Sequence, residues 1–259
     1  MNKIFQNNLI LFWMILLNLN NPLFSSEPNS FYIQKNLVNN GNNPFWMKSN
    51  RWGVNPGNSI SLNFNYNSAK FNFLRLKGDI IKIRNDIQII EGNFSLAIKN
   101  YQIKIGKIKY FHGIADQELS SVSLILSKNS EPIPKILIEN TRPLIFEMNK
   151  IKFLINIGLS HGLIEKGDYI LQPHLHEKWA NLKIKKNNLS FYLGLVHNAI
   201  FGGGTNEFGL LPSSAEDFLR VFFVQNGDEN APQNENINSL GNHLGIWDLG
   251  LSINSKNYN

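Results

Sequence analysis

The chain contains no cysteine among its 259 residues. This absence excludes a disulfide framework, a zinc site with thiolate ligands and a cysteine nucleophile. An envelope protein without redox chemistry fits a cysteine-free chain, and so do many soluble proteins. The length fits one large domain or two small ones, and the 42% of hydrophobic residues suffices for an ordinary core.

Long apolar runs are also missing after the N-terminus. Residues 9–19 read LILFWMILLNL behind Lys3, and the small residues Ser25 and Ser26 follow. These eleven residues are fewer than the roughly 20 that cross a bilayer as a helix. The pattern therefore predicts a cleaved signal peptide over residues 1–26. No later stretch approaches about 18 unbroken apolar residues, so we expect no transmembrane helix.

The positive charge is not concentrated in any one segment. The net charge is +6, and most of it comes from lysines spread along the chain. No nucleic-acid-binding module is visible, so nucleic acid is not an expected partner. An acidic polymer or the anionic headgroups of lipopolysaccharide would suit the charge better. A lysine-rich surface exposed to water would also explain the positive charge, without any ligand.

Alternating segments dominate the rest of the chain. Ile60, Leu62 and Phe64 alternate with polar residues, and this period of two predicts a half-buried strand. Asn187-Asn188 separates two such segments and predicts a hairpin turn, because asparagine tolerates positive φ. The same alternation recurs over residues 101–106, 150–157, 180–185, 189–195 and 247–254.

A secreted chain of repeated amphipathic strands fits two fold classes. One is a soluble β-sandwich or β-helix, whose polar face meets water. The other is an all-β, antiparallel outer-membrane β-barrel, whose apolar face meets lipid and whose polar face lines the lumen. Periodicity alone leaves both open.

Two segments interrupt the alternation. Residues 27–57 are rich in Asn, Pro and Gly, and we expect a loop-rich lead-in from the periplasmic side. Residues 58–259 would supply the strands of the barrel. Within them, residues 198–239 form the longest stretch without strand periodicity, which predicts a structured extracellular loop.

That long loop contains the signal for a short helix. Ser213 and Glu216 have the spacing of a capping box, with Ser213 as the N-cap. Phe218 and Phe222 then share one helix face. Such a helix could fold inward over the lumen or lie on the surface, and the sequence leaves both open.

Residues 174–178 are the first candidates for chemistry. His174 and His176 point the same way on a strand and could bind a metal. Glu177 would face the opposite side, and no third ligand has a supporting spacing, so a structural role is expected for the two histidines. A metalloprotease pattern would need a second histidine four residues after the first, on a helix.

Other catalytic patterns are incomplete. Residues 202–204 (GGG) lack the Lys-Ser/Thr of a phosphate-binding loop and are expected to form a turn. No Gly-x-Ser-x-Gly elbow is present. Ser160 and His161 are neighbours, which on a strand face opposite ways and cannot pair as nucleophile and base. The sequence therefore predicts neither a catalytic residue nor a cofactor.

A series of short motifs runs in a fixed order along the chain. The motifs are residues 43–46 (NPFW), 49–53 (SNRWG), 119–124 (LSSVSL), 127–135 (SKNSEPIPK), 159–162 (LSHG), 175–178 (LHEK), 194–195 (GL) with His197, 202–203 (GG), 218–222 (FLRVF) and 242–245 (NHLG) with Asp248. This series resembles the Wzi family of capsule assembly proteins, which are outer-membrane β-barrels.

The resemblance implies a large antiparallel barrel in the outer membrane of a Gram-negative bacterium. Such a barrel would help attach or assemble capsular polysaccharide at the cell surface, binding the glycan without cleaving it. One departure is Phe201, where the family usually has tryptophan before the glycine pair. The motifs cover roughly the N-terminal half of a family member, so we expect the barrel to be incomplete in this chain.

The resemblance also implies the site residues and the partners. Expected partners are capsular polysaccharide, outer-membrane lipid and lipopolysaccharide, and the barrel-assembly machinery during biogenesis. The candidate residues would contact glycan or line the lumen, with individual roles unassigned, or would form a polar plug that holds the barrel shape. They are His176, Glu177, Lys178, His197, Gly202, Gly203, Arg220, Asn242 and His243.

Three other functions remain open from the sequence. The first is an outer-membrane hydrolase or deacylase of lipid or glycan, with His197 and His243 as candidate general bases. The second is a passive porin, and the third is a soluble periplasmic β protein.

Overall fold

The computed structural model describes residues 28–37, 45–54, 57–68, 73–114 and 123–254. The expected signal peptide, residues 1–26, lies outside these ranges. Residues 43–44 and 119–122, which belong to motifs of the family resemblance, lie outside them too.

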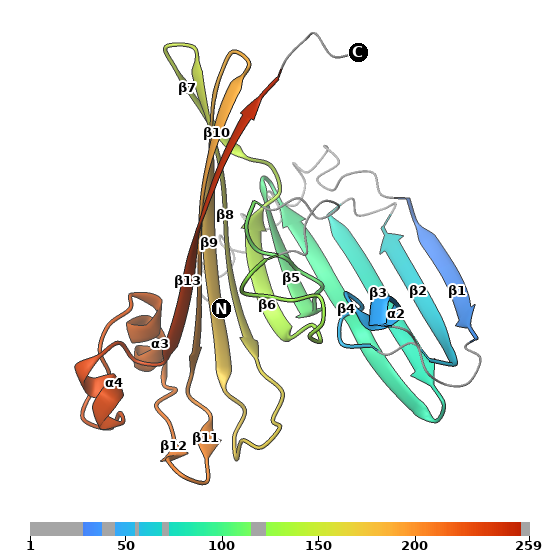
Figure 1. Ribbon diagram of the computed structural model, residues 1–259, viewed down its shortest axis with the longest axis vertical. Helices are drawn as coiled ribbons and strands as arrows, with labels where there is room; N and C mark the ends of the chain where they lie inside the picture. Colours follow the sequence, from blue (N-terminus) through green and yellow to red (C-terminus); the bar gives the residue numbers. More distant parts are fainter. Residues whose placement is uncertain (1–27, 38–44, 55–56, 69–72, 115–122, 255–259) are drawn as a thin grey trace, which may run out of the picture.

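One large antiparallel sheet forms the body of the molecule (Figure 1). Its spatial order is β1-β2-β3-β4-β5-β6-β8-β9-β10-β13, with β7 paired to β8. The strands are β1 (Ser30–Asn36), β2 (Ser59–Asn67), β3 (Leu74–Ile83), β4 (Asp86–Ile98), β5 (Tyr101–Lys107), β6 (Pro134–Asn140), β7 (Leu144–Met148), β8 (Ile151–Leu163), β9 (His174–Lys186), β10 (Leu189–Phe201) and β13 (Asn242–Ile253).

The remaining elements are short. They are the helices α2 (Phe45–Lys48), α3 (Ala215–Phe222) and α4 (Gln233–Ile237), and the two-stranded ribbon of β11 (Gly204–Thr205) and β12 (Gly209–Leu210). The prediction of an antiparallel all-β fold is confirmed. Within the described residues no helix is long and apolar enough to cross a membrane.

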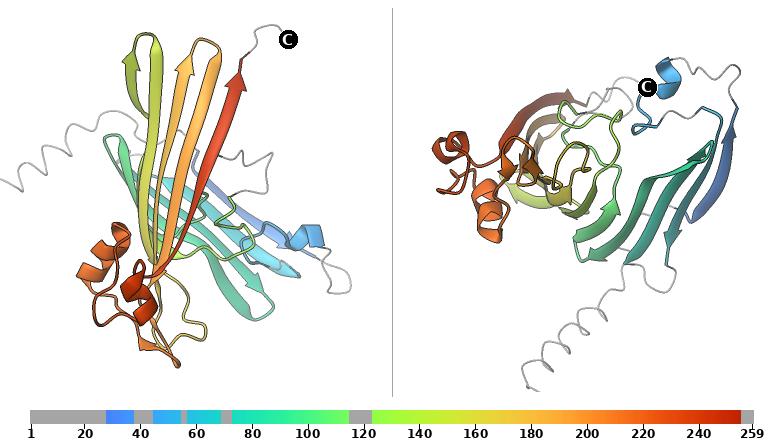
Figure 2. Two further views of the ribbon diagram at one scale, coloured as in Figure 1. Left: turned by 60° about the vertical axis from the view of Figure 1, so that its left-hand side comes forward. Right: turned by 90° about the horizontal axis from the view of Figure 1, so that it is seen from below.

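The sheet is strongly curved and open. Figure 2 shows it from below as an arc around the described parts of the segment after β5, residues 108–114 and 123–133. In the described ranges β1 and β13 are its two edge strands and do not pair with each other. The structure thus contains a curved sheet, and no closed barrel is formed by these residues.

The hairpin prediction at Asn187-Asn188 is confirmed. Lys186 pairs with Leu189 across this turn, and Asn187 has φ +51°. The registers of β9, β10 and β13 then run without interruption over twelve or more residue pairs. Because the side-chain period of a strand is two, an uninterrupted register keeps each side chain on the same face from strand to strand.

The segment expected to be a loop-rich lead-in, residues 27–57, also contains a strand that its composition did not reveal. Ser30–Asn36 is strand β1, which pairs with β2 along its whole length. Phe31 and Ile33 lie opposite Phe64 and Leu62. This strand has only two large apolar residues on that face, too few to reveal a period, and it is held by pairing with β2.

The two faces of the sheet differ sharply in composition. We call the convex side the outer face and the side that holds the segment after β5 the concave face (Figure 2). Many large apolar side chains of the outer face are exposed to a third or more of their area. They include Phe31, Ile33, Ile60, Tyr66, Leu76, Phe94, Ile105, Ile136, Ile138, Phe191, Leu195, Trp247, Leu249, Leu251 and Ile253.

The concave face carries mainly polar and charged side chains. Lys104 pairs with Glu139 across neighbouring strands at 3.1 Å, and Lys109 pairs with Asp79. Residues 49–54, 108–114 and 123–133 cover parts of this face. Ile108 packs with Leu137, Trp179 and Val196 in a buried apolar cluster.

Helix α3 begins one residue later than expected. Its N-cap is Ser214, and the capping box uses Asp217 instead of Glu216. Both serines have an acidic residue three positions on, so the sequence was compatible with either serine as the N-cap. With Ser214 as the N-cap, the side chain of Val221 packs in a buried cluster with Phe201 and Ala199 of the sheet.

The sequence left open whether α3 folds inward over the lumen or lies on the surface, and its position in the structure distinguishes the two. Phe218 contacts the rings of His161 and His176, at centroid distances of 5.2 and 5.3 Å. These two histidines pair with each other on the outer face. Helix α3 therefore covers one end of the outer face and does not reach into the concave side (Figure 2).

Candidate functional site

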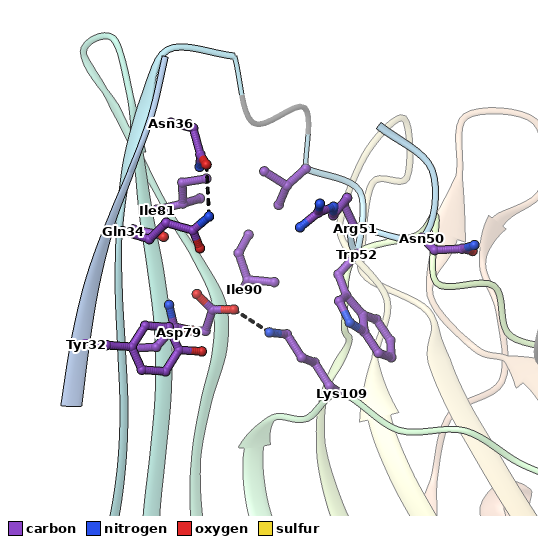
Figure 3. A pocket seen from close by; sticks show the side chains of 13 residues that line it. Tyr32, Gln34, Asn36, Asn50, Arg51, Trp52, Asp79, Ile81, Ile90 and Lys109 are labelled. Carbon is purple, nitrogen blue, oxygen red and sulfur yellow. Dashed lines mark hydrogen bonds and ion pairs between the residues drawn. The ribbon is translucent and has the colours of Figure 1, made fainter. Parts of the chain in front are cut away.

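The concave face contains a polar pocket of about 300 Å³ between β1–β4 and the loop after α2 (Figure 3). Three kinds of group line it: side chains of the strands, side chains of the loop, and one lysine from the segment after β5. They are Tyr32, Gln34, Asn36, Ser61, Asn63, Asp79, Ile81 and Ile90 from the strands, Asn50, Arg51, Trp52 and Val54 from the loop, and Lys109.

Strand alternation and one small apolar cluster build this pocket. Tyr32, Gln34 and Asn36 are every second residue of β1 and so share the concave face. Val54 is buried against Ile81 and Ile90, with Trp52 and Ile83 packed at the margin. This cluster anchors the loop to the sheet and leaves the polar strand residues beside it.

The loop reaches the pocket through an unusual backbone. Asn50 and Trp52 have φ of +57° and +58°, a region that costs a non-glycine residue of order 1–3 kcal/mol. Hydrogen bonds to the segment after β5 offset that cost. The amide of Trp52 donates to the carbonyl of Lys128 at 2.5 Å, and the amide of Asn50 donates to the side chain of Asn129 at 2.6 Å.

Most polar groups of the pocket are already paired. Lys109 forms an ion pair with Asp79, and the amide of Asn63, with its NH₂ turned toward Asp79, donates to that carboxylate at 3.0 Å. Gln34 donates to the side-chain oxygen of Asn36 at 3.0 Å. These bonds fix the orientation of the amides and the carboxylate before any ligand arrives.

Arg51 differs from these groups. It is exposed, and its side chain reaches into the pocket toward β1 and β3 (Figure 3). Throughout the described part of the chain, its guanidinium has no carboxylate within ion-pair distance and no hydrogen-bond partner. The pocket thus combines paired amides, the hydroxyls of Tyr32 and Ser61, two aromatic rings and one guanidinium without a described partner.

Glu177, one of the sequence-derived candidates, lies on the concave face but inside the protein. Its carboxylate contacts His112 Nε2 at 2.9 Å and Lys135 Nζ at 2.6 Å, and it accepts a hydrogen bond from Ser160. All four side chains are almost fully buried. The network has no open side, so it holds the sheet and the segment after β5 together.

Aromatic rings close this network from the side of the segment after β5. Tyr110 and His112 lie 5.0 and 4.7 Å from the ring of Trp179, centroid to centroid. The hydroxyl of Tyr110 donates to Glu139 at 2.6 Å. Burial raises the pKa of Tyr110 well above its ordinary value, and the negative charge of Glu139 adds to the shift.

His176 and Lys178 lie on the outer face, opposite to Glu177. His176 pairs with His161 on β8, and Lys178 pairs with His197 on β10. Neighbouring residues of a strand face opposite sides. Strand β9 therefore divides these candidates between two faces, and His176 and Lys178 do not lie on the concave side with Glu177.

Five of the six histidines gather on this outer face beneath α3. His161 Nε2 lies 3.1 Å from His174 Nδ1, and His197 Nε2 lies 2.9 Å from His243 Nδ1. His176 is fully buried between them. Among the described residues, no group of three or more histidine and acidic side chains is arranged to hold a metal ion.

The other candidates have structural positions. Gly202 and Gly203 have φ of +64° and +76° and connect β10 to β11, while the turn lies further on, at residues 206–208. A Cβ on Gly203 would lie 2.9 Å from the carbonyl of Leu171. Arg220 pairs with Glu216 at 2.7 Å on the surface of α3. Asn242 is an exposed residue at the start of β13.

Sequence reasoning missed the pocket because its parts lie far apart in the chain. Strand β1 was interpreted as loop, and nothing in the sequence brings Lys109 to Asp79. One signal was present: residues 49–53 form a motif of the resemblance, and its asparagine and glycine are the residue types that most readily adopt positive φ.

Comparisons with known proteins give no match. No protein-family model, no curated protein and no solved structure is similar to this chain. The functional argument therefore depends on the geometry of the sheet and the pocket.

Proposed function

We propose that this chain is an outer-membrane protein whose strands cross the bilayer and whose concave face binds polysaccharide, helping to attach or assemble capsular polysaccharide without cleaving it. The observation that carries the proposal is the division of the sheet into two faces. Exposed apolar side chains cover the outer face over nearly all its strands, while ion pairs and amides occupy the concave face.

The exposed outer face favours a lipid environment over water. A soluble monomer rarely exposes a contiguous apolar patch larger than a few hundred Å². A β-sandwich would cover such a face with a second sheet, whereas in the described residues only α3 and its neighbouring loop cover one end of it. In a bilayer the unpaired edges of β1 and β13 would need partner strands, because backbone groups cannot stay unsatisfied in hydrocarbon.

The pocket supports the glycan part of the proposal. Sugar hydroxyls both donate and accept hydrogen bonds, and the pocket presents amides and two hydroxyls that do the same. Tyr32 and Trp52 add aromatic rings with an apolar body. Packing of the segment after β5 into the concave side is less compatible with a passive porin.

Two adjacent residues of β13 provide the test. Leu251 lies on the outer face and Ser252 on the concave face. Because the chain has no cysteine, Leu251→Cys and Ser252→Cys can each carry one environment-sensitive dye. We expect the dye at residue 251, in protein folded into phospholipid vesicles, to be quenched by spin-labelled lipid, and the dye at 252 to be quenched by aqueous iodide.

The same two labelled variants can also contradict the membrane assignment. Equal quenching by iodide at both residues, in protein with native β-sheet circular dichroism, would mean that the outer face meets water. The outer face would then be a surface for another protein or for a second sheet.

A further inference from the structure

We infer that the concave pocket recognises an acidic saccharide and that Arg51 holds its carboxylate. This inference rests on the proposed glycan binding and adds the class of sugar. It starts from the one charged side chain of the pocket that has no partner in the described structure, and it requires only residues that line the same cavity.

The charges around the pocket leave Arg51 uncompensated. The charge of Asp79 is neutralised by Lys109. Glu131 lies beside Gly53 and pairs with Lys107 at 3.0 Å. Glu91 lies opposite Asp79 on the neighbouring strand, and the positive charges of Lys109 and Lys77 act on it. The three carboxylates and the three lysines cancel, so the guanidinium contributes the net positive charge of the site.

Arginine suits a carboxylate for geometric reasons. Its planar guanidinium can donate two parallel hydrogen bonds to the two oxygens of a carboxylate, which a neutral sugar hydroxyl cannot match. The loop backbone directs the side chain: Asn50 and Trp52 on either side are held at positive φ by bonds to residues 128 and 129. The guanidinium is thus presented from a fixed loop toward the strands (Figure 3).

The remaining lining fits the rest of a sugar ring. Tyr32 is 54% exposed on β1, and Trp52 lies on the opposite side of the pocket, with its ring 5.0 Å from that of Phe111. Gln34 and Asn36 lie beside Tyr32 on β1, and Asn63 lies opposite Tyr32 on β2. These amides line the same pocket as donors and acceptors for hydroxyl groups. A uronic acid residue would suit both the guanidinium and the amides, with its carboxylate bound to Arg51 and its hydroxyls bound to the amides.

The test compares acidic tetrasaccharides with their carboxyl-reduced forms. The full chain in detergent micelles is titrated by calorimetry with tetrasaccharides of galacturonate, of mannuronate and of hyaluronan, and with the reduced form of each. We expect at least one acidic form to bind about tenfold or more tightly than its reduced form, because a hydrogen bond between charged groups contributes about that factor. Added salt should weaken the acidic form and leave the reduced form unchanged.

Three variants assign the effect to Arg51. Arg51→Gln should remove the preference, and Arg51→Lys should restore part of it, since lysine keeps the charge without the planar fork. Arg142→Gln removes the same charge from an exposed turn between β6 and β7 and should keep the full preference. Circular dichroism identifies any variant that fails to fold.

The outcomes separate this inference from the proposed function. Equal binding of acidic and reduced forms, or a preference that persists in Arg51→Gln, overturns the role of Arg51 and leaves glycan binding in place. Binding of no tetrasaccharide of either kind overturns both.

Discussion

The two halves of the concave face carry the same kinds of polar side chain and differ in what covers them. Beside β1–β3 the polar groups surround a pocket open to solvent. Beneath β6, β8 and β9 the segment after β5 packs over the sheet and buries the Glu177 network completely. Covered polar groups must satisfy one another, whereas uncovered ones stay available to a ligand.

This difference in cover explains why charged side chains on the same face have different roles in the two halves. Glu177 is held by three partners and has no access to a substrate. Arg51 lacks a partner in the described structure and projects into space. The same alternation of strand residues therefore produces a rigid core in one half and a binding surface in the other.

The largest expected effect is on the covered half. Glu177→Ala leaves Lys135 buried without its counter-charge, and removing one member of a buried ion pair costs about 3–5 kcal/mol. The free energy of unfolding, measured in urea by tryptophan fluorescence, should fall by that amount. Glu147→Ala is the matched control, because its pair with Lys152 is half exposed and contributes about 0–1 kcal/mol. Similar losses in the two variants would mean that the network does not hold the sheet and segment together.

An intermediate effect is expected from pH. An unfolded tyrosine ionises near pH 10, and burial raises the pKa of Tyr110 in the folded protein. Folding therefore favours the protonated phenol. Its contribution to stability is complete below pH about 10 and is lost as the pH rises through the folded pKa.

Tyr110→Phe tests this pH dependence. We expect the variant to lose about 1 kcal/mol at neutral pH, the typical value of one hydrogen bond, and to show a smaller decline in stability above pH about 10. Tyr169→Phe, at an exposed tyrosine, is the control for the loss at neutral pH and should keep the wild-type stability there. An unchanged alkaline decline in Tyr110→Phe would assign the decline to other groups.

The smallest effect concerns the uncovered half. Tyr32 on the concave face and Tyr66 on the outer face have nearly equal exposure, 54% and 51%, on neighbouring strands. Tyr32→Ala should weaken binding of the acidic tetrasaccharide about fivefold, corresponding to roughly 1 kcal/mol for an aromatic contact. Tyr66→Ala should leave binding unchanged. Equal losses in calorimetry would point to a general effect on the sheet, because these two rings lie on opposite faces.

The sequence anticipated those parts of the fold that depend on local periodicity. The strands containing Phe64, Leu182 and Leu251 and the turn at Asn187 all follow from alternation and turn chemistry. Strand β1 was missed because its formation depends on β2, and the start of α3 was shifted because two capping frames were equally good. Local signals thus identified elements better than they fixed boundaries.

The candidate site was much harder to predict than the fold. The sequence put His176 and Glu177 on opposite sides of a strand, and β9 shows this arrangement. It could not tell that Glu177 meets His112 and Lys135, residues 65 and 42 positions away. Nor could it tell that Lys109 meets Asp79 at the pocket.

The sequence by itself determined the alternating strands, and with them which side chains share a face, because the side-chain period of a strand is independent of distant parts of the chain. Only the tertiary structure decided which polar groups are covered. That outcome depends on where the segment after β5 and the loop after α2 come to lie, and their positions are set by packing against residues such as Trp179 and Ile81 that no local pattern connects to them.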